Sequence, residues 1–446
     1  MRRLIYSLSL ITTLLPVISH AQDEPTPLSL DDAIKYAIRH NYTLKNARLD
    51  VGIQQAQNAQ VTASAYPKIN GKGEFDDFIN PQTSFIPGEF FGGPAGSFYP
   101  VTFTPKFANS AGISGSQVLF DGSLLVALKA RKAVMELAER KADVTDATVR
   151  YNVIKAYNSL VIAYRQFYIL ESSLQYARSI QHDIAVTRQA GFAEKIDVER
   201  VDVQVNNLAS DSLRIANVLT VSEQMLKYNM GMNLDKPIVL TDTNIDEHRS
   251  HIMELLNEDA DYNRVPEYNL SLSALKLNEY NVRRYKLAAL PSLAAFGNVG
   301  YNYSSNDFYR LFQDRYAFSS LVGLQLTVPI FNGFLRVNQL KEAKLNVLKS
   351  KNDIANAKLG IDFQANTART TLKNNLLQAE SQKRNLALAN DVLDLAQKKY
   401  KAGVGSNMEV TQAQTDQLRA QTNYFSAELD VINAEADLQK ALGLLK

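Results

Sequence analysis

The chain has 446 residues, of which 46% are hydrophobic, and its formal net charge is +2. That length allows about three ordinary domains, and the balanced charge argues against a nucleic-acid partner, because phosphate binding requires a concentrated basic face. The sequence contains no cysteine, so no disulfide can stabilise the fold.

Residues 1–21 have the features of a secretory signal peptide. A basic start precedes a mostly apolar run over residues 4–18, and the small-residue segment 19–21 is suited to cleavage. A transmembrane anchor is the competing interpretation, but the apolar run is short for a membrane helix and Pro16 interrupts it. We therefore expect the mature chain to start at Gln22 and to be exported.

Two copies of one pattern of helix breaks follow. Phe120-Asp121-Gly122 recurs as Phe331-Asn332-Gly333, 211 residues later, and Ala190-Gly191 recurs as Ala402-Gly403, 212 residues later. This constant spacing indicates an internal duplication. The predicted divisions are a first repeat at 22–231, a polar linker at 232–264 and a second repeat at 265–446.

Each repeat is predicted to contain a helix, two strands, a long helix, a break and another helix. The first repeat has strands at about 67–80 and 107–120 and helices at 122–189 and 194–230. The second has strands at about 291–304 and 317–331 and helices at 334–402 and 406–442. Proline and glycine are almost absent from the long helices, and 122–189 would form a helix about 100 Å long, too long for a compact domain.

Hydrophobic spacing in these helices indicates a coiled coil. Val410, Ala413 and Gln417 begin a stripe that alternates steps of three and four, and Val201, Val205 and Leu208 do the same in the first repeat. Small and polar residues in the stripe permit close helix packing. We interpret the stripes as structural and assign them no cofactor.

The predicted strands have one apolar and one polar face. In 317–331, for example, Phe318 and Val322 alternate with Ser319. Strands of this length and alternation are typical of a transmembrane β-barrel. A membrane helix over 316–335 is disfavoured by its proline, its glycines and its two-residue alternation, whereas a half-buried soluble sheet stays open as an alternative.

Aromatic residues gather at the ends of these strands, as in the interfacial girdle of a barrel. They are Phe85, Phe90, Phe91, Phe98, Tyr99, Phe103 and Phe107 in the first hairpin, and Tyr301, Tyr303, Phe308, Tyr309, Phe312, Tyr316 and Phe318 around the second. Four strands cannot close a barrel, and lipid does not tolerate an open sheet edge. The chain is therefore predicted to be an obligate oligomer, with eight strands from two copies, twelve from three or sixteen from four.

This duplicated architecture behind a signal peptide resembles the TolC-like outer-membrane efflux proteins over nearly all of the mature chain. The segment Tyr400-Lys401-Ala402-Gly403, followed by Glu409, is similar to the family's Tyr-x-x-Gly segment with an acidic residue six positions after the glycine. Gly191 and Asp197 hold the same places in the first repeat. The Phe-Asp-Gly and Phe-Asn-Gly segments resemble the family's strand-to-helix turns.

The resemblance implies a mixed α and β membrane protein. Three chains would contribute four strands each to a twelve-stranded outer-membrane barrel, which continues into a long periplasmic tube of coiled helices. The linker 232–264 would wrap the middle of the tube. The protein would be the gated exit duct of a tripartite efflux or secretion system, without enzymatic chemistry and without a cofactor.

Partners follow from the same resemblance. They would be two further copies of the chain, outer-membrane lipid, a periplasmic membrane-fusion adaptor and an inner-membrane transporter of the RND or ABC class. Drug, metal, siderophore or peptide cargo all stay open.

Family adaptors dock at positions that match Ala190-Gly191-Phe192 and Ala402-Gly403-Val404 here, although turns of this kind also require glycine for their backbone angles. Asp197 and Glu409 match positions at the narrow entrance, where a ring of carboxylates would attract cations. The alternative for Glu409 is a capping box with Ser406, because an acidic residue suits a helix N-terminus.

The chain departs from the family at two places in this entrance. A second acidic ring is replaced by Arg200 and Gln412, and the basic residue that latches the gate is replaced by Gly405. Tyr400 keeps the aromatic partner of that latch. The latch is therefore predicted to be weaker or built differently, with Arg200 as the candidate.

Other classes of protein fit less well. His248, His251 and Glu254 lack the zincin spacing, so no metal site is expected, and no nucleophile elbow or phosphate-binding loop is present. A passive porin would need more strands in each chain. A periplasmic fibrous or adhesive coiled coil would not need glycine-rich hairpins with aromatic ends.

Overall fold

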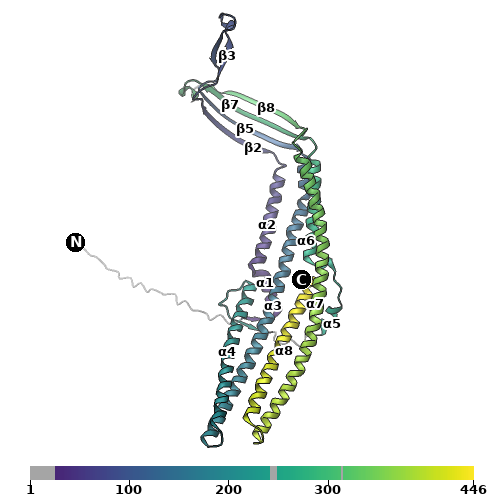
Figure 1. The fold of residues 1–446 in the computed structure, drawn as a ribbon. Coiled ribbons are helices and arrows are strands. Elements are labelled where there is room, and N and C mark those ends of the chain that lie inside the picture. Colours follow the sequence, from purple (N-terminus) through teal and green to yellow (C-terminus); the bar gives the residue numbers. More distant parts are fainter. Residues whose placement is uncertain (1–25, 242–248, 313–314, 446) are drawn as a thin grey trace, which may run out of the picture. The chain divides into compact units, whose positions relative to one another are not determined.

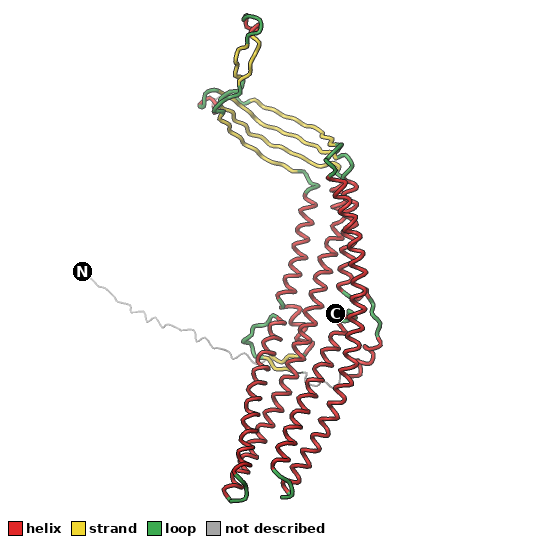
Figure 2. Tube along the Cα trace, in the orientation of Figure 1, coloured by secondary structure: helices red, strands yellow, loops and turns green. Residues whose placement is uncertain are grey.

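The computed structural model describes residues 26–241, 249–312 and 315–445, so the predicted signal peptide lies outside the described residues. Long helices, one four-stranded sheet and two two-stranded sheets make up the described chain (Figures 1 and 2). It divides into two compact units, each built from both halves of the sequence. In the described residues, the first unit contains 26–41, Asn152–Glu254 and Asn375–Asn433, and the second contains Tyr42–Tyr151, Leu255–Asn374 and 434–445.

The bounds of the elements are as follows. The helices are α1 (Leu30–His40), α2 (Tyr42–Ala63), α3 (Gly122–Gln189), α4 (Lys195–Met230), α5 (Arg249–Asn257), α6 (Pro266–Leu287), α7 (Leu335–Lys401) and α8 (Asn407–Ala441). The strands are β1 (Thr26–Leu28), β2 (Lys68–Asp77), β3 (Thr83–Pro87), β4 (Phe98–Thr102), β5 (Phe107–Phe120), β6 (Ile238–Leu240), β7 (Ser292–Ser305) and β8 (Ala317–Thr327). Short 3-10 turns cover η1 (Gly88–Phe91), η3 (Tyr262–Arg264) and η4 (Tyr309–Phe312).

The four long helices lie within one residue of the ranges expected from the sequence, and α3 begins and ends as expected. Their length follows from local chemistry, because no proline and almost no glycine interrupts them. Two bounds of the strands were wrong. The strand expected to reach 80 ends at Asp77, and the strand expected to reach 331 ends at Thr327, before Pro329, which has no N–H for the ladder.

Three further differences come from elements that the sequence did not reveal. The first hairpin loop contains its own strand pair, β3 and β4. The expected linker 232–264 contains β6, α5 and η3, and β6 pairs in parallel with β1. The first helix is divided at Asn41, whose extended ψ of 125° ends α1.

The four-stranded sheet, in the second unit, has the order β2-β5-β7-β8 with antiparallel pairing throughout. Its register pairs Ile113 with Val299 and Leu293 with Leu326. The apolar sets of the four strands therefore lie on one face, as strand alternation requires. Leu321, which pairs with Asn298, lies on the other face. A register shift between Val118 and Phe120 interrupts the ladder at Leu119.

The core of the first unit lies between the long helices. One buried cluster is formed by Leu170, Leu174, Ala177 and Ile184 of α3 with Val201, Val205 and Leu208 of α4. A second contains Ala396 of α7 with Val410 and Ala413 of α8. These α4 and α8 residues belong to the predicted stripes, so the coiled-coil spacing forms the core. Tyr157 of α3, also buried, donates a hydrogen bond to the Leu28 carbonyl at 3.1 Å and thereby holds β1.

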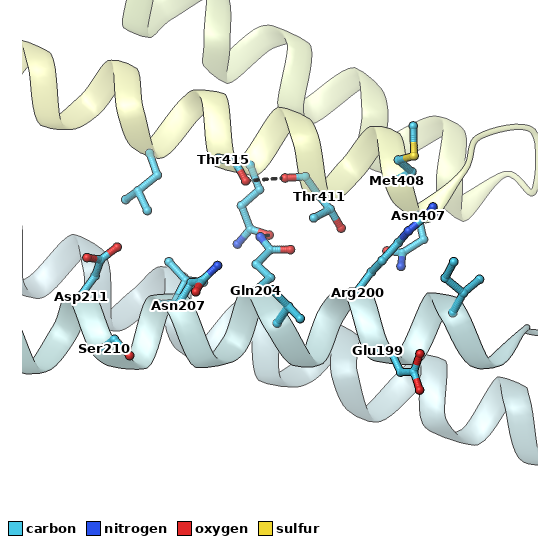
Figure 3. Close-up of a pocket in the computed structure, with 15 residues that line it drawn as sticks. Glu199, Arg200, Gln204, Asn207, Ser210, Asp211, Asn407, Met408, Thr411 and Thr415 are labelled. Carbon is cyan, nitrogen blue, oxygen red and sulfur yellow. Dashed lines mark hydrogen bonds between the residues drawn. The ribbon is translucent and has the colours of Figure 1, made fainter.

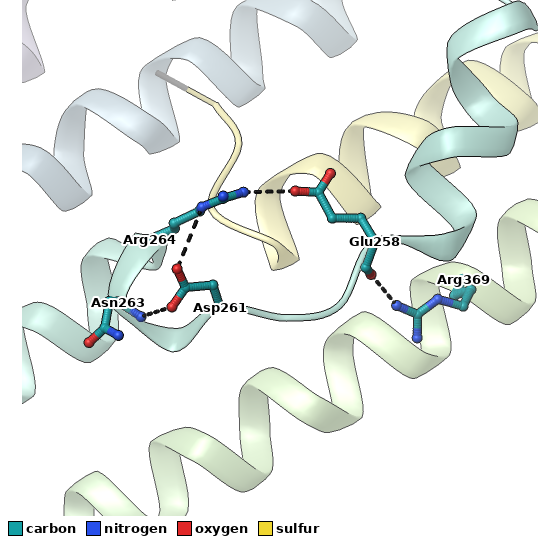
Figure 4. A network of polar contacts seen from close by, with 5 residues as sticks. All are labelled: Glu258, Asp261, Asn263, Arg264 and Arg369. Atoms are coloured by element: carbon teal, nitrogen blue, oxygen red, sulfur yellow. Dashed lines mark hydrogen bonds and ion pairs between the residues drawn. The ribbon is translucent and has the colours of Figure 1, made fainter.

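In the second unit, polar contacts attach the segment 256–265 to α7 (Figure 4). Arg369 of α7 donates hydrogen bonds to the backbone carbonyls of Leu256 at 2.9 Å and Glu258 at 2.7 Å. Arg264 forms ion pairs with Glu258 at 2.7 Å and Asp261 at 3.6 Å. Charge-assisted bonds to backbone carbonyls fix a segment that has little regular structure of its own.

Candidate functional site: helix turns and amphipathic sheet

The predicted docking residues of the first repeat form the turn between α3 and α4. Gly191 has a φ of +83°, and its N–H donates to the Arg188 carbonyl at 2.9 Å. The Phe192 N–H donates to the Thr187 carbonyl at 3.0 Å, so the last carbonyls of α3 are satisfied within the turn. Ala190 is exposed, and the Phe192 side chain is 86% exposed. A rigid turn thus presents an aromatic ring to its surroundings.

The turn between α7 and α8 has the same construction. Gly403 has a φ of +74° and its N–H donates to the Tyr400 carbonyl at 3.0 Å, while the Val404 N–H donates to the Lys399 carbonyl at 3.1 Å. Ala402 is exposed, and Val404 is 78% exposed. The glycine is required in both turns because L side chains rarely adopt these backbone angles.

The structure gives a physical reason for Gly405, where the family resemblance implies a basic residue. A Cβ at this position would be 2.9 Å from the Lys399 Cβ and 2.9 Å from the Tyr400 backbone nitrogen. The backbone N–H of Gly405 donates a hydrogen bond to the Lys399 carbonyl at 3.1 Å. The tight turn therefore has no room for a larger side chain in this conformation.

The two predicted entrance carboxylates lie in the first turns of α4 and α8 and have different local roles. Asp197 completes a capping box with Glu194, whose backbone N–H donates to Asp197 Oδ2 at 3.3 Å. For α8, the backbone N–H of Glu409 donates to Ser406 Oγ at 3.2 Å, so the serine caps the helix as predicted. In the sequence, a capping box with Ser406 was the alternative interpretation of Glu409, and the structure shows the serine half of it, whereas the box of Glu194 and Asp197 was not identified there.

The remaining predicted entrance residues make different contacts in the first unit. Tyr400 packs against the buried cluster of α7 and α8. The side-chain amide of Gln412 donates to Asp416 Oδ2 at 3.0 Å, along α8. Arg200 lines a groove between α4 and α8, where Figure 3 shows it extending toward Asn407 and Met408.

This groove has a volume of about 760 Å³ and a mixed lining. Gln204 Nε2 donates to Gln414 Oε1 across it at 3.1 Å, and the amide of Gln414 continues to the Ser173 carbonyl at 3.4 Å. Asn407 Oδ1 is buried and has no hydrogen-bond partner within the described part of the chain. These amides were not predicted, because they lie outside the predicted stripes and the sequence does not show which helix they meet.

Tyr176 is another residue near the entrance that the sequence did not single out. Burial raises the pKa of its hydroxyl, and the neighbouring Asp183 and Tyr400 add to the increase.

The second part of the site is the apolar face of the four-stranded sheet. Val322 is 88% exposed, and Ile69, Leu324 and Leu326 are also exposed. A contiguous apolar face of this extent requires a cover, and lipid is the cover in transmembrane barrels. Within the described residues, the outer strands β2 and β8 each have one neighbouring strand, so each leaves one edge unpaired.

Aromatic contacts show that part of the predicted clusters gathers at one end of this sheet, whereas Phe85, Phe98 and Tyr99 of the first cluster lie in the separate β3–β4 pair. Phe308 packs edge-on against Phe75 at 6.0 Å and Phe107 at 5.5 Å between ring centroids. Tyr303 packs against Tyr316 at 5.9 Å. These rings belong to strands and to the β7–β8 connection, as in an interfacial girdle.

No helix in the described ranges has both the length and the hydropathy needed to cross a bilayer.

Metal-ligand clusters are likewise absent from residues 26–241, 249–312 and 315–445. His248 and the side chain of His251 lie outside what the structure describes.

Comparison with known proteins decides the family. The sequence matches the outer membrane efflux protein family over residues 33–231 and 273–444, which is most of the chain. The chain belongs to the outer membrane efflux protein family. This efflux protein is therefore an outer-membrane protein. Its mixed architecture of helices and strands agrees with this family.

Individual relatives of this efflux protein are distant in sequence. Outer membrane protein TolC of Vibrio cholerae is 23% identical over 256 residues, which are 55% of this chain and 56% of TolC. The match therefore spans about half the length of that relative.

Solved structures extend the similarity to the whole fold. The CmeC outer membrane channel of Campylobacter jejuni is 19% identical, with a TM-score of 0.72 over 93% of this chain and 85% of CmeC. CusC is 20% identical, with a TM-score of 0.73 over 95% of both chains. The efflux protein thus shares the fold of outer-membrane channels.

Proposed function

We propose that this protein is the outer-membrane exit duct of a tripartite efflux or secretion system. The observation that carries the proposal is the sheet. It is apolar on one face, leaves both outer edges unpaired within the described residues, and its strands lead into helices that end in exposed turns. Three chains of four strands supply the twelve strands of a closed barrel, which leaves no edge in lipid. The duct moves solutes and performs no chemistry on them.

The helices form the periplasmic tube of this duct, and the α3–α4 and α7–α8 turns mark its inner end. Asp197 and Glu409 lie beside these turns, so three copies place six carboxylates near the entrance. Such a ring favours cations. A capping role does not remove the charge of Asp197, and the carboxylate can serve both purposes.

Partners dock on the exposed turns. A periplasmic membrane-fusion adaptor contacts Phe192 and Val404, the most exposed apolar residues of the two turns. An inner-membrane transporter of the RND or ABC class supplies the cargo through this adaptor.

The two halves of the chain are a duplication, supported by their matching turns.

Planar-bilayer conductance of the detergent-purified protein tests the proposal. We expect small cation-selective steps, and lower cation selectivity for Asp197→Asn with Glu409→Gln. Glu199→Gln is the matched control, because this exposed acid of α4 pairs with Lys195 at 2.9 Å. Stable insertion with unchanged ion selectivity would support the duct and contradict the proposed role of the carboxylate ring. Failure to insert under any condition would overturn the duct and favour a fibrous coiled coil.

A further inference from the structure

The connection between β2 and β5 carries a hairpin that is separate from the main sheet. Its strands β3 and β4 pair in antiparallel register from Thr83–Thr102 to Pro87–Phe98. Figure 1 shows β3 beyond the end of the sheet strands. We name residues 83–102 the aromatic hairpin, because Phe85, Phe90, Phe91, Phe98 and Tyr99 within it are all exposed.

The tip of the aromatic hairpin is tightly built. The Gly88 N–H donates to the Ser97 carbonyl at 2.6 Å, and Ser97 Oγ donates to the Pro94 carbonyl at 2.7 Å. A Cβ on Gly88 would be 2.0 Å from Ser97 Oγ. Phe91 packs edge-on against Tyr99 at 6.2 Å. An ordered tip presents its aromatic rings in fixed positions, which lowers the entropic cost of binding.

Both faces of this hairpin are apolar, and they differ from each other. The register places Phe85 and Phe98 on one face and Ile86 with Tyr99 on the other. A two-stranded hairpin with an uncovered apolar surface on both sides is not stable alone in water. Each face therefore requires its own cover.

The cover must be uncharged. Residues 78–105 contain no lysine or arginine and one acidic residue, Glu89, whose carboxylate accepts from the Gly96 N–H at 3.3 Å. Anionic lipid headgroups are recognised by clustered basic side chains, which this segment lacks. Another uncharged apolar protein surface is the better match.

The hairpin leaves the sheet beside one of its outer strands. Asp77 at the end of β2 pairs with Phe107 at the start of β5, so the hairpin leaves the sheet beside the unpaired edge of β2. In the proposed trimer that edge pairs with β8 of the next copy. Three aromatic hairpins then stand around one barrel mouth, each beside a boundary between copies.

We propose that the three aromatic hairpins pack into a ring across the outer mouth of the barrel, with the Phe85 face of one copy against the Tyr99 face of the next. Two unlike faces in contact form a head-to-tail interface, which closes into a ring when the copies are related by a threefold axis. The ring buries both apolar faces of every hairpin. This inference rests on the proposed trimeric duct.

Disulfide trapping in isolated outer membranes tests the ring, because the chain contains no natural cysteine. Phe85→Cys and Tyr99→Cys point to opposite faces of one hairpin, so oxidation of the double variant should link each chain to the next. We expect most of the protein to migrate as a covalent trimer after denaturation and to return to monomer on reduction. Neither single-cysteine variant should form a disulfide between two copies of the chain. Phe85→Cys with Tyr309→Cys, on the β7–β8 connection, is the matched control and should not form trimers.

The outcomes separate this proposal from the proposed function. If unboiled samples migrate as trimers but oxidation gives no cross-link between hairpins, the ring is overturned and the proposed duct is not. Absence of trimers in unboiled samples would overturn the duct itself. Dimers of Phe85→Cys alone would show like faces in contact and would also overturn the ring. Quenching by brominated lipid of a bimane label attached to the Phe85→Cys variant would assign the hairpin to the membrane and overturn the ring.

Discussion

Gly231 lies against His40: a methyl group on its α-carbon would be 2.6 Å from the His40 carbonyl oxygen. Gly443, at the equivalent position 212 residues later, lies equally close to the backbone of Arg264, at 2.6 Å. Both glycines end a long helix with a positive φ, 69° and 70°, and both contact backbone next to the start of another helix. The two halves of the chain therefore use the same contact, which supports a duplication.

Replacing either glycine should destabilise the protein. Gly231→Ala and Gly443→Ala combine a left-handed backbone, which costs about 1–2 kcal/mol for an L residue, with a steric clash. We expect a lower melting temperature for both, measured by thermal unfolding in detergent. Gly360→Ala is the control, because Gly360 lies within α7 with no atom within 4 Å of its added Cβ. This change should stabilise by about 0.5–1 kcal/mol. Equal melting temperatures for all three variants would contradict the contact.

The capping role of Asp197 can be separated from its charge. Asp197→Ala removes the acceptor of the Glu194 N–H, a hydrogen bond worth about 1 kcal/mol, so backbone amide exchange in the first turn of α4 should rise about fivefold. Asp197→Asn keeps a carbonyl acceptor and should change exchange little. Hydrogen exchange with mass spectrometry measures both. Equal amide exchange rates in the alanine and asparagine variants would contradict the capping role of Asp197.

For α8 the capping group is the serine. Ser406→Ala should increase amide exchange at the start of α8 by a similar factor, because Ser406 Oγ accepts the Glu409 N–H. Glu409→Ala keeps this backbone donor and should leave exchange unchanged. A large increase in Glu409→Ala would show that its carboxylate is needed for the cap.

Adaptor docking should depend on the two exposed apolar side chains of the turns. Phe192→Ser and Val404→Ser should reduce efflux, measured as accumulation of a fluorescent dye in cells, by roughly tenfold in combination if each loses about 0.7 kcal/mol of apolar contact. Trimer yield in the outer membrane should stay unchanged. Tyr168→Ser removes a similarly exposed aromatic ring elsewhere on α3 and serves as control. Normal efflux in the double variant would place the adaptor elsewhere.

An ion pair in the second unit should give a pH-dependent contribution to stability. Lys276 of α6 donates a hydrogen bond to Glu136 of α3 at 2.6 Å, and this bond holds the pKa of the Glu136 carboxyl below its ordinary value of 4.5. A lowered carboxyl pKa stabilises the fold above pH 4.5, and the stabilisation is lost as the pH falls through the lower value of the folded state. The wild type should therefore melt at a higher temperature than Lys276→Met at neutral pH, and the difference should shrink below pH 4.5.

The control for this prediction removes an ion pair that lies within one helix. Arg384 and Glu380 of α7 are four residues apart and exposed, with 3.3 Å between the charged atoms. Arg384→Met should change the melting temperature little at any pH, because exposed pairs contribute little. A Lys276→Met difference that persists unchanged at acidic pH would contradict the lowered pKa of Glu136.

Local chemistry in the sequence was sufficient to predict the long helices, the turns that end them and the apolar faces of the strands. Helices as long as α3 follow from the lack of proline and glycine, and Gly191 and Gly403 mark turns because their backbone angles exclude most other residues. The alternation in β8 identified an apolar face without knowledge of its neighbours. All of these features depend on residues that are close together along the chain.

Contacts between distant segments were decided only by the tertiary structure. The register of β5 on β7 joins residues far apart in the sequence, such as Ile113 and Val299, and neither strand alone specifies it. The same holds for the amide contact between Gln204 and Gln414 and for the strand pair of the aromatic hairpin. Gly405 shows the difference most clearly. The sequence revealed a missing basic side chain, whereas the structure showed that the preceding turn leaves no space for one, because steric exclusion depends on where the chain folds back on itself.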